Sequence, residues 1–244
     1  MVFHFRQRQL QHNSFNLLIN NQPIERVNSF NFLGLILDQH MTWNVHIQST
    51  SHKISRTIGV MNRLKHYLPM EILRYLYNAL ILPYFQYALL TWGFKNNRLT
   101  KLQKRAVRVI TRSKYNAHTE PLFKNLNLLK LDDLFKMNML KLYYKLKNGT
   151  LPVYFMSMFS DVEARHGYNT RTHGDLQMQF SKTSSCQNCV RFLLPRFINE
   201  TDDAILSKVS THSFPGFNTY VKGYIMNKYR TSCEVHNCYI CNRV

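Results

Sequence analysis

Residues 97–114 read NRLTKLQKRAVRVITRSK, and this stretch decides the fold. Its apolar residues recur at the spacing of an amphipathic helix; they are Leu99, Leu102, Ala106, Val109 and Ile110. Cations occupy an adjacent face spanning roughly 100° of the helix. We call this set the basic ridge: Lys101, Lys104, Arg105, Arg108 and Arg112. No Asp or Glu lies in the stretch to neutralise it, so the pattern predicts a half-buried helix with a continuous cationic surface.

Helical patterns also lie on both sides of this stretch. One helix is predicted from an N-cap at Thr42 to about residue 67, and a second from about residue 70 to a kink or break near Pro83. A further helix is predicted over residues 131–148, before Gly149 and Pro152. Beyond it, the sequence predicts an exposed loop at 166–177, a short strand at 190–197, and modest helices near 200–209 and 214–228.

The segment before the helices has the chemistry of strands. SFNLLI, the turn-prone NNQP and IERVNSFNFLGLIL, in residues 14–37, predict an antiparallel β-hairpin with its turn at NNQP. Because a lone hairpin is marginal in water, we expect it to be the edge of a sheet whose other strands lie upstream. The predicted fold is therefore mainly α, with a hairpin in 1–40, a helical bundle in 41–150 and a less regular C-terminal extension in 151–244.

The charge of the chain is strongly positive and uneven. It has 32 Lys and Arg against 13 Asp and Glu, a formal net charge of +19, which is typical of proteins that meet phosphate or anionic lipid. Residues 1–150 carry 22 basic and 6 acidic residues, whereas residues 151–244 carry 10 and 7. The pattern favours nucleic acid as the partner and places the contact surface in the first part. A basic face that is merely solvated is the alternative.

One uncharged segment is long enough to span a bilayer, YLYNALILPYFQYALLTWGF at residues 75–94. Asn78, Pro83, Gln86 and the tyrosines inside it favour a buried helix instead. The first residues, MVFHFRQRQLQHNS, lack the apolar region of a secretory signal. We therefore expect no membrane span and an intracellular protein, in the nucleus or cytoplasm, that is not secreted.

No candidate catalytic residue emerges from the sequence. Nucleotidyl transfer by two metals needs carboxylates that converge on a pair of ions. The adjacent acidic pairs, Asp132-Asp133 and Asp202-Asp203, each begin a predicted helix, where negative charge caps the helix end. Asp38 follows an apolar run and is expected to end a strand and turn the chain. The histidines and serines show no nucleophile elbow, phosphate loop or HExxH pattern.

The cysteines all lie in the last part of the chain. Cys186 and Cys189 form one C-x2-C pair, and Cys238 and Cys241 form another, with Cys233 left over. This spacing is typical of a structural zinc site, although the 48 residues between the pairs exceed those of a usual knuckle. Reduced, unpaired thiols are the alternative, because the count is odd and no signal peptide is visible.

Several stretches, in order, resemble one known family. FNFLGLILDQHMTWNVHI, KISRTIGVMNRLKHYLP, LYNALILPYFQYALLTWG, RLTKLQKRAVRVIT, YNAHTEPLFKNLNLLKLDDLF, LPVYF and YNTR are similar to the C-terminal part of reverse transcriptases of non-LTR retrotransposons. The resemblance covers most of the chain, from about residue 1 to beyond residue 225. The ending NCYICN is also similar to what such elements carry after their polymerase.

The resemblance implies a position within the polymerase. In that family an aromatic-x-Asp-Asp turn that holds the catalytic Mg²⁺ precedes the F-x-x-L-G strand, here Phe30 to Gly34, and nothing before this strand matches it. Residues 1–40 would then be the end of the palm, with Phe32, Leu33 and Gly34 in the primer-grip hairpin.

Residues 42 to about 148 would form the thumb, which holds an RNA template and DNA primer by their backbones. The basic ridge has the chemistry for such sequence-independent phosphate contacts. This chain would then lack the catalytic Asp pair, be inactive alone and carry no cofactor except the hypothetical Zn²⁺. A standalone RNA- or DNA-binding protein derived from a retroelement is the alternative, and the oligomeric state is left open.

Overall fold

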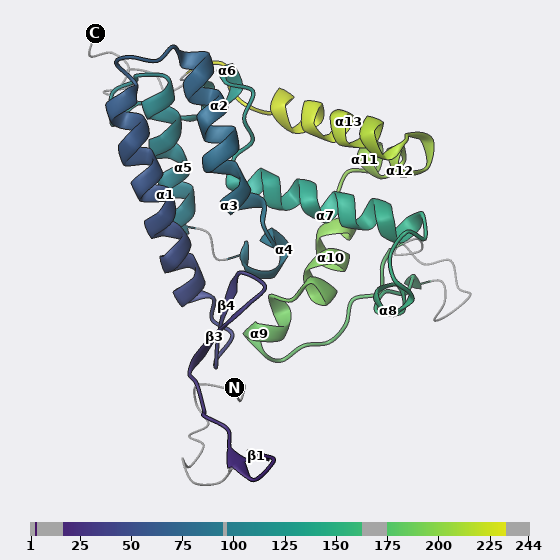
Figure 1. The fold of residues 1–244 in the computed structure, drawn as a ribbon. Coiled ribbons are helices and arrows are strands. Elements are labelled where there is room, and N and C mark those ends of the chain that lie inside the picture. Colours follow the sequence, from purple (N-terminus) through teal and green to yellow (C-terminus); the bar gives the residue numbers. More distant parts are fainter. Residues whose placement is uncertain (1–2, 4–16, 95–96, 163–174, 233–244) are drawn as a thin grey trace.

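A computed structural model describes residues 3, 17–94, 97–162 and 175–232 of the chain. The fold is mainly helical, with small antiparallel hairpins before the helices, so the predicted fold class is confirmed (Figure 1). Within these ranges, no helix combines the length and the apolarity needed to cross a bilayer.

Three helices form the first layer. α1 (Asn44–Leu64), α2 (Met70–Leu80) and α5 (Asn97–Ile110) lie side by side, and α1 packs against α5 (Figure 1). The predicted break near Pro83 is confirmed, because α2 ends at Leu80 and a short helix, α3 (Leu82–Gln86), follows. Pro83 lacks an N–H, which suits the first turn of a new helix and not the interior of an old one. α4 (Leu89–Trp92) completes this end of the bundle.

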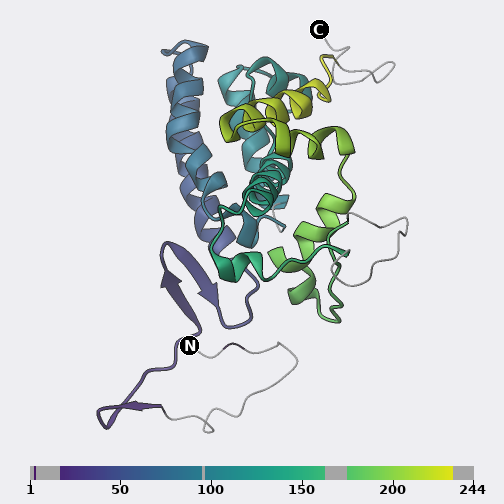
Figure 2. The same cartoon turned by 90° about the vertical axis from the view of Figure 1, so that its right-hand side faces the viewer.

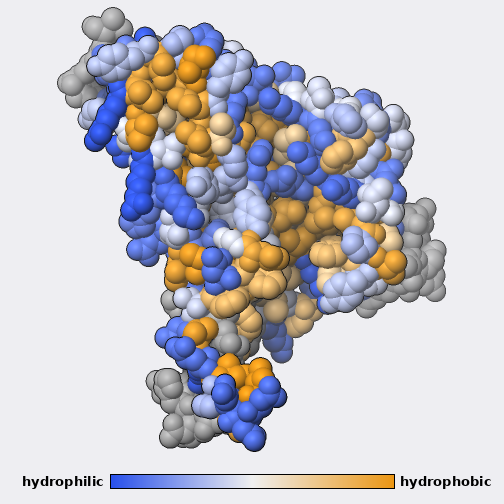
Figure 3. All heavy atoms as spheres, in the orientation of Figure 1, coloured by the Kyte–Doolittle hydropathy of each residue, from blue (hydrophilic) through white to orange (hydrophobic). Residues whose placement is uncertain are grey.

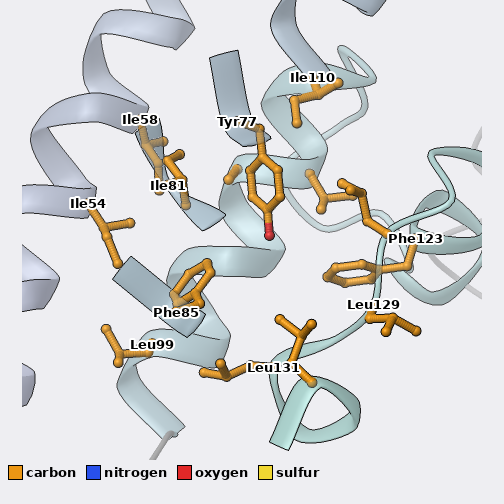
Figure 4. Packing of buried hydrophobic residues seen from close by; sticks show 14 of the residues in the cluster. Ile54, Ile58, Tyr77, Ile81, Phe85, Leu99, Ile110, Phe123, Leu129 and Leu131 are labelled. Atoms are coloured by element: carbon orange, nitrogen blue, oxygen red, sulfur yellow. The ribbon is translucent and has the colours of Figure 1, made fainter. Parts of the chain in front are cut away.

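The core of this bundle is made by large apolar side chains that face one another (Figure 4). Those that are 0% exposed include Ile54, Ile58, Leu73, Tyr77, Ile81, Phe85, Trp92, Leu99 and Ile110. The segment YLYNALILPYFQYALLTWGF therefore contributes the second half of α2, and all of α3 and α4, to a protein core, as its polar residues and proline indicated.

One polar side chain lies in the middle of this core. Gln103 of α5 is 0% exposed, and its Nε2 donates to Tyr77 Oη and to the carbonyl oxygen of Leu129, both at 3.0 Å. Its Oε1 accepts from the backbone N–H of Leu131 at 2.8 Å. Gln103 thereby joins α2 and α5 to the segment between α6 (Glu120–Asn125) and α7 (Leu131–Lys147). These bonds set the rotation of α5 about its own axis.

A second core lies beyond the bundle and shares α7 with it. Met139, Leu140 and Tyr143 of α7 pack there against α10 (Val190–Asn199) and α13 (Phe214–Asn227). In Figure 2, α7 is seen end-on between the bundle and these C-terminal helices. Shorter helices connect them: α8 (Val153–Met156), α9 (Ser184–Gln187), α11 (Asp203–Leu206) and α12 (Lys208–Thr211). The division of the chain into domains at residues 40 and 150 stays a prediction.

The strand predicted at 190–197 is wrong, because this segment forms α10. Leu194 and Ile198 are one helical turn apart and are both buried, so packing against α7 outweighs the strand preference of its aromatic residues. The helices predicted near 200–209 and 214–228 are confirmed, the first of them divided into α11 and α12. Most of the predicted loop at 166–177 lies outside the described residues.

The N-terminal segment forms two hairpins, so the prediction of one hairpin with a long second strand is wrong. β1 (Leu18–Ile19) pairs with β2 (Gln22–Pro23), and β3 (Ser29–Phe32) pairs with β4 (Leu35–Asp38). Leu33 and Gly34, with φ of 49° and 81°, turn the chain inside the apolar run. Two successive positive φ angles are the requirement of a type I′ hairpin turn. The hydroxyl of Tyr87 donates to the carbonyl oxygen of Leu33 and holds this turn on the helices.

Asp38 has the structural role predicted for it. β4 ends there, and its Oδ1 accepts from the backbone N–H of Thr42 at 2.6 Å, while the Thr42 hydroxyl donates to Oδ2. Thr42 is not the N-cap of α1, because this role falls to Trp43 with φ 62°. The predicted N-cap therefore lies one residue before the observed one, and Thr42 bonds to Asp38.

Replacing Gln103 by Leu is expected to lower the free energy of unfolding by about 3 kcal/mol or more, because buried groups on three segments lose their partner, each costing about 1–3 kcal/mol. Tyr77→Phe is the matched control. It removes one of these hydrogen bonds, so we expect a loss of about 1 kcal/mol. Urea unfolding followed by circular dichroism measures both, and equal losses would contradict the central role of Gln103.

His46 predicts a pH dependence of stability. Burial, with a contribution from the charge of Lys53, lowers its pKa below the ordinary 6.5. Its Nδ1 accepts from the backbone N–H of Ile36 at 3.4 Å, and its ring lies 5.7 Å from that of Trp92. In the unfolded chain His46 takes up a proton below pH 6.5, whereas in the folded chain it stays neutral to lower pH. Stability is therefore lost as the pH falls below 6.5.

His46→Asn keeps an acceptor near Ile36 and does not titrate. We expect the drop in unfolding free energy between pH 7 and 5.5 to be smaller in this variant than in the wild type, since the other histidines contribute equally to both. Chemical denaturation at each pH measures the difference. If the unfolding free energy falls equally with pH in the two proteins, His46 does not cause the pH dependence.

Candidate nucleic-acid interface

The middle of α5 places three predicted cations in solvent. Gln103 fixes one face of the helix in the core. Lys101 and Arg105, two residues before and after it, each lie about 160° from Gln103 around the helix axis, which is nearly the opposite face. Lys101, Lys104 and Arg105 are exposed. Within the described part of the chain, none of the three forms an ion pair. These side chains are available to an external anion.

Arg108 is only partly available, because it also has a structural role. Its side chain is half-buried, and its Nε donates to the carbonyl oxygen of Ala117 at 2.9 Å. Burial lowers the pKa of the Arg108 guanidinium. Arg108 therefore holds the loop that follows α5 against the helix.

Arg112 does not lie on the helix, since α5 ends at Ile110 and not near residue 114. Arg112 has φ 53°, and the N–H of Ser113 donates to the carbonyl oxygen of Arg108 at 3.0 Å. This is the Schellman arrangement that ends a helix with one left-handed residue. The Arg112 guanidinium is exposed and donates to the carbonyl oxygen of Leu68 at 2.9 Å. The structure thus separates Arg112 from the helical part of the basic ridge.

The predicted primer-grip residues lie at the opposite end of the bundle from Arg112. Phe32 and Leu33 are 54% and 74% exposed at the tip of the β3–β4 hairpin, which leads into the first turn of α1. Arg112 bonds to Leu68, just beyond the last turn of α1. Because α1 has 21 residues, the two ends are roughly 30 Å apart. Phe32, Leu33 and Gly34 therefore lie far from Arg112, at the opposite end of α1.

Sequence reasoning missed a second basic helix beside the first. α1 carries exposed Lys53, Arg56 and Arg63 and contains no Asp or Glu. Hydrophilic side chains follow the edge of the molecule that α1 forms (Figure 3). The sequence did indicate this second basic helix, because Glu71 is the only acidic residue between Asp38 and Glu120.

One residue of each acidic pair has partners within the protein. Asp133 accepts from the Tyr229 hydroxyl and lies 3.6 Å from Lys136 Nζ. Asp202 accepts from the Tyr224 hydroxyl, and this bond, with the charge of Lys228, lowers the Asp202 pKa. Among the described residues, no three His, Cys, Asp or Glu side chains converge as metal ligands would.

The zinc hypothesis stays a prediction. Cys186 lies in α9 and Cys189 lies two residues after its end, and both thiols are free and exposed. Cys238 and Cys241, the other ligands of the hypothetical site, lie outside the described residues.

Comparison with known proteins gives one informative relative. Over 105 residues the chain is 29% identical to a protein of Drosophila melanogaster described as a probable RNA-directed DNA polymerase from transposon BS. The match covers 40% of this chain and 12% of that protein. No protein-family profile matches the chain, and no solved structure does. The similarity supports an origin related to the reverse transcriptases of transposons.

Proposed function

We propose that this chain is the primer-grip and thumb region of a retrotransposon reverse transcriptase and binds the template-primer duplex through its phosphates. The observation that carries the proposal is the set Lys101, Lys104 and Arg105 on α5, which is exposed and forms no ion pair among the residues that the structure describes. A thumb must hold any sequence, and cations that contact phosphate bind without reading bases. The relation to a transposon polymerase supports the same assignment.

The dimensions of the bundle suit this role. α1 and α5 pack along each other, and both have exposed cations and no acidic residue. A duplex lying along the roughly 30 Å of α1 would extend over about nine base pairs at the 3.4 Å rise of B-form DNA. The hairpin tip with Phe32 and Leu33 would lie at one end of that duplex, where a primer terminus is expected.

The proposal includes no metal site in this chain. Asp133 and Asp202 are held by tyrosine hydroxyls and lysines on different helices, and they serve the fold. The Mg²⁺-binding carboxylates would belong to another part of the polymerase. The alternative, a standalone binding protein derived from a retroelement, uses the same surface.

Arg105→Ala is expected to weaken binding to an RNA–DNA hybrid several-fold. It should also reduce the slope of log K against log salt concentration by about one, since one phosphate contact is lost. Titrations by fluorescence anisotropy at several salt concentrations measure both quantities.

Arg191→Ala is the matched control, because Arg191 is also exposed but lies on α10, outside the proposed interface. We expect the slope of log K against log salt concentration for Arg191→Ala to equal that of the wild type. Equal slopes for wild type and Arg105→Ala would place α5 outside the interface.

The purified chain is expected to extend no primer on an RNA template with Mg²⁺ and deoxynucleotides, because its acidic pairs are not arranged to hold two metal ions. A gel-based extension assay measures this, with an intact reverse transcriptase as the positive control. Template-dependent synthesis would contradict the assignment of the metal site to another part.

A further inference from the structure

A cavity of about 390 Å³ opens beside the basic ridge. α5 forms one wall with Thr100 and Lys104, α6 and the residue before it form another, and Arg230 and Ser232 close the far rim. Lys104 belongs both to the cavity and to the ridge. A strand held along α5 would therefore pass its mouth.

The walls of the cavity are held by a contact between distant parts of the chain. Tyr229, which is 4% exposed, follows α13 and packs in the core of the bundle. Its carbonyl oxygen accepts from Lys124 Nζ at 2.7 Å, and its hydroxyl accepts from the backbone N–H of Lys130 at 2.9 Å. Arg230 is thus placed at the cavity by the residue before it.

The lining carries both signs of charge in fixed positions. Lys130 Nζ donates to Glu120 Oε1 at 2.8 Å. This bond, together with the charge of Arg230, lowers the pKa of Glu120, so its carboxylate stays ionised. Asp132 adds a second carboxylate, while Pro121 and Phe123 supply an apolar wall.

This combination matches a nucleotide. Lys104 and Arg230 suit a phosphate, and carboxylate oxygens accept from the amino groups of bases. The volume lies within the 300–1,000 Å³ range of small-molecule sites. A base can enter such a pocket only when it is unpaired.

We propose that this cavity holds one unpaired nucleotide of the nucleic acid that lies along α5. The inference rests on the proposed function, since it requires a strand on the basic ridge. It adds a selectivity that phosphate contacts alone do not provide, a preference for a duplex with a bulged or unpaired nucleotide.

Two RNA–DNA hybrids test the proposal with the full chain. One is fully paired, and the other carries a single bulged 2-aminopurine. We expect the wild type to bind the bulged hybrid at least about fivefold more tightly. Binding should also protect the 2-aminopurine from quenching by acrylamide.

Thr100→Trp fills the cavity from α5 without changing its charge. We expect it to abolish the preference and the protection, while affinity for the paired hybrid stays as in the wild type. Ser232→Trp, at an exposed position on the opposite rim, is expected to have the same effect. It serves as the test variant if thermal unfolding shows that Thr100→Trp is misfolded. Arg105→Ala should weaken binding of both hybrids by the same factor.

The outcomes separate the two proposals. If the wild type binds both hybrids equally, or if both filled variants keep the preference, the cavity is a solvated cleft and the thumb function stands. If the wild type binds neither hybrid, the proposed function and the nucleotide site fail together.

Discussion

The buried hydrogen bonds of Gln103 are the constraint on which the rest of the structure depends. A polar side chain with no exposure must satisfy its donors and acceptor inside the protein, because leaving them unpaired costs about 1–3 kcal/mol each. Only one rotation of α5 lets Gln103 reach Tyr77, Leu129 and Leu131 together. That rotation directs Lys101 and Arg105 into solvent. The core thus determines where the charge is displayed.

The same network connects the two halves of the chain. Gln103 holds the N-terminus of α7, and α7 carries residues of both cores. Tyr229 then returns from the C-terminal helices and bonds to Lys124, Lys130 and Asp133. Asp133 therefore acts as an anchor for the end of α13, which explains an acidic residue at the start of α7 beyond its interaction with the helix dipole.

The predictions from sequence succeeded where periodicity was long and failed where one residue changed the backbone direction. The apolar face of α5 follows from spacing alone, and so does the break at Pro83. The turn at Leu33-Gly34 was hidden, since its residues also fit a continuous strand and only positive φ angles distinguish the two. The end of α5 was missed for the same reason, because a left-handed arginine carries no sequence signal comparable to glycine. The strand predicted over α10 shows that packing against α7 can override local preference.

The position of Gln103 was visible in the sequence, four residues after Leu99 and four before Val107, but its role was not. A glutamine on an apolar face can be buried with hydrogen-bond partners, or it can be exposed where the apolar face is interrupted. Which of the two occurs depends on partners more than 20 residues away in the sequence. The basic ridge has the same ambiguity. Lys101 and Arg105 are exposed, whereas Arg108 and Arg112 bond to backbone carbonyls that sequence spacing does not bring near them. Charge reversal of all five cations would therefore change the structure as well as the surface charge, whereas substitution of Lys101, Lys104 or Arg105 changes the surface charge alone.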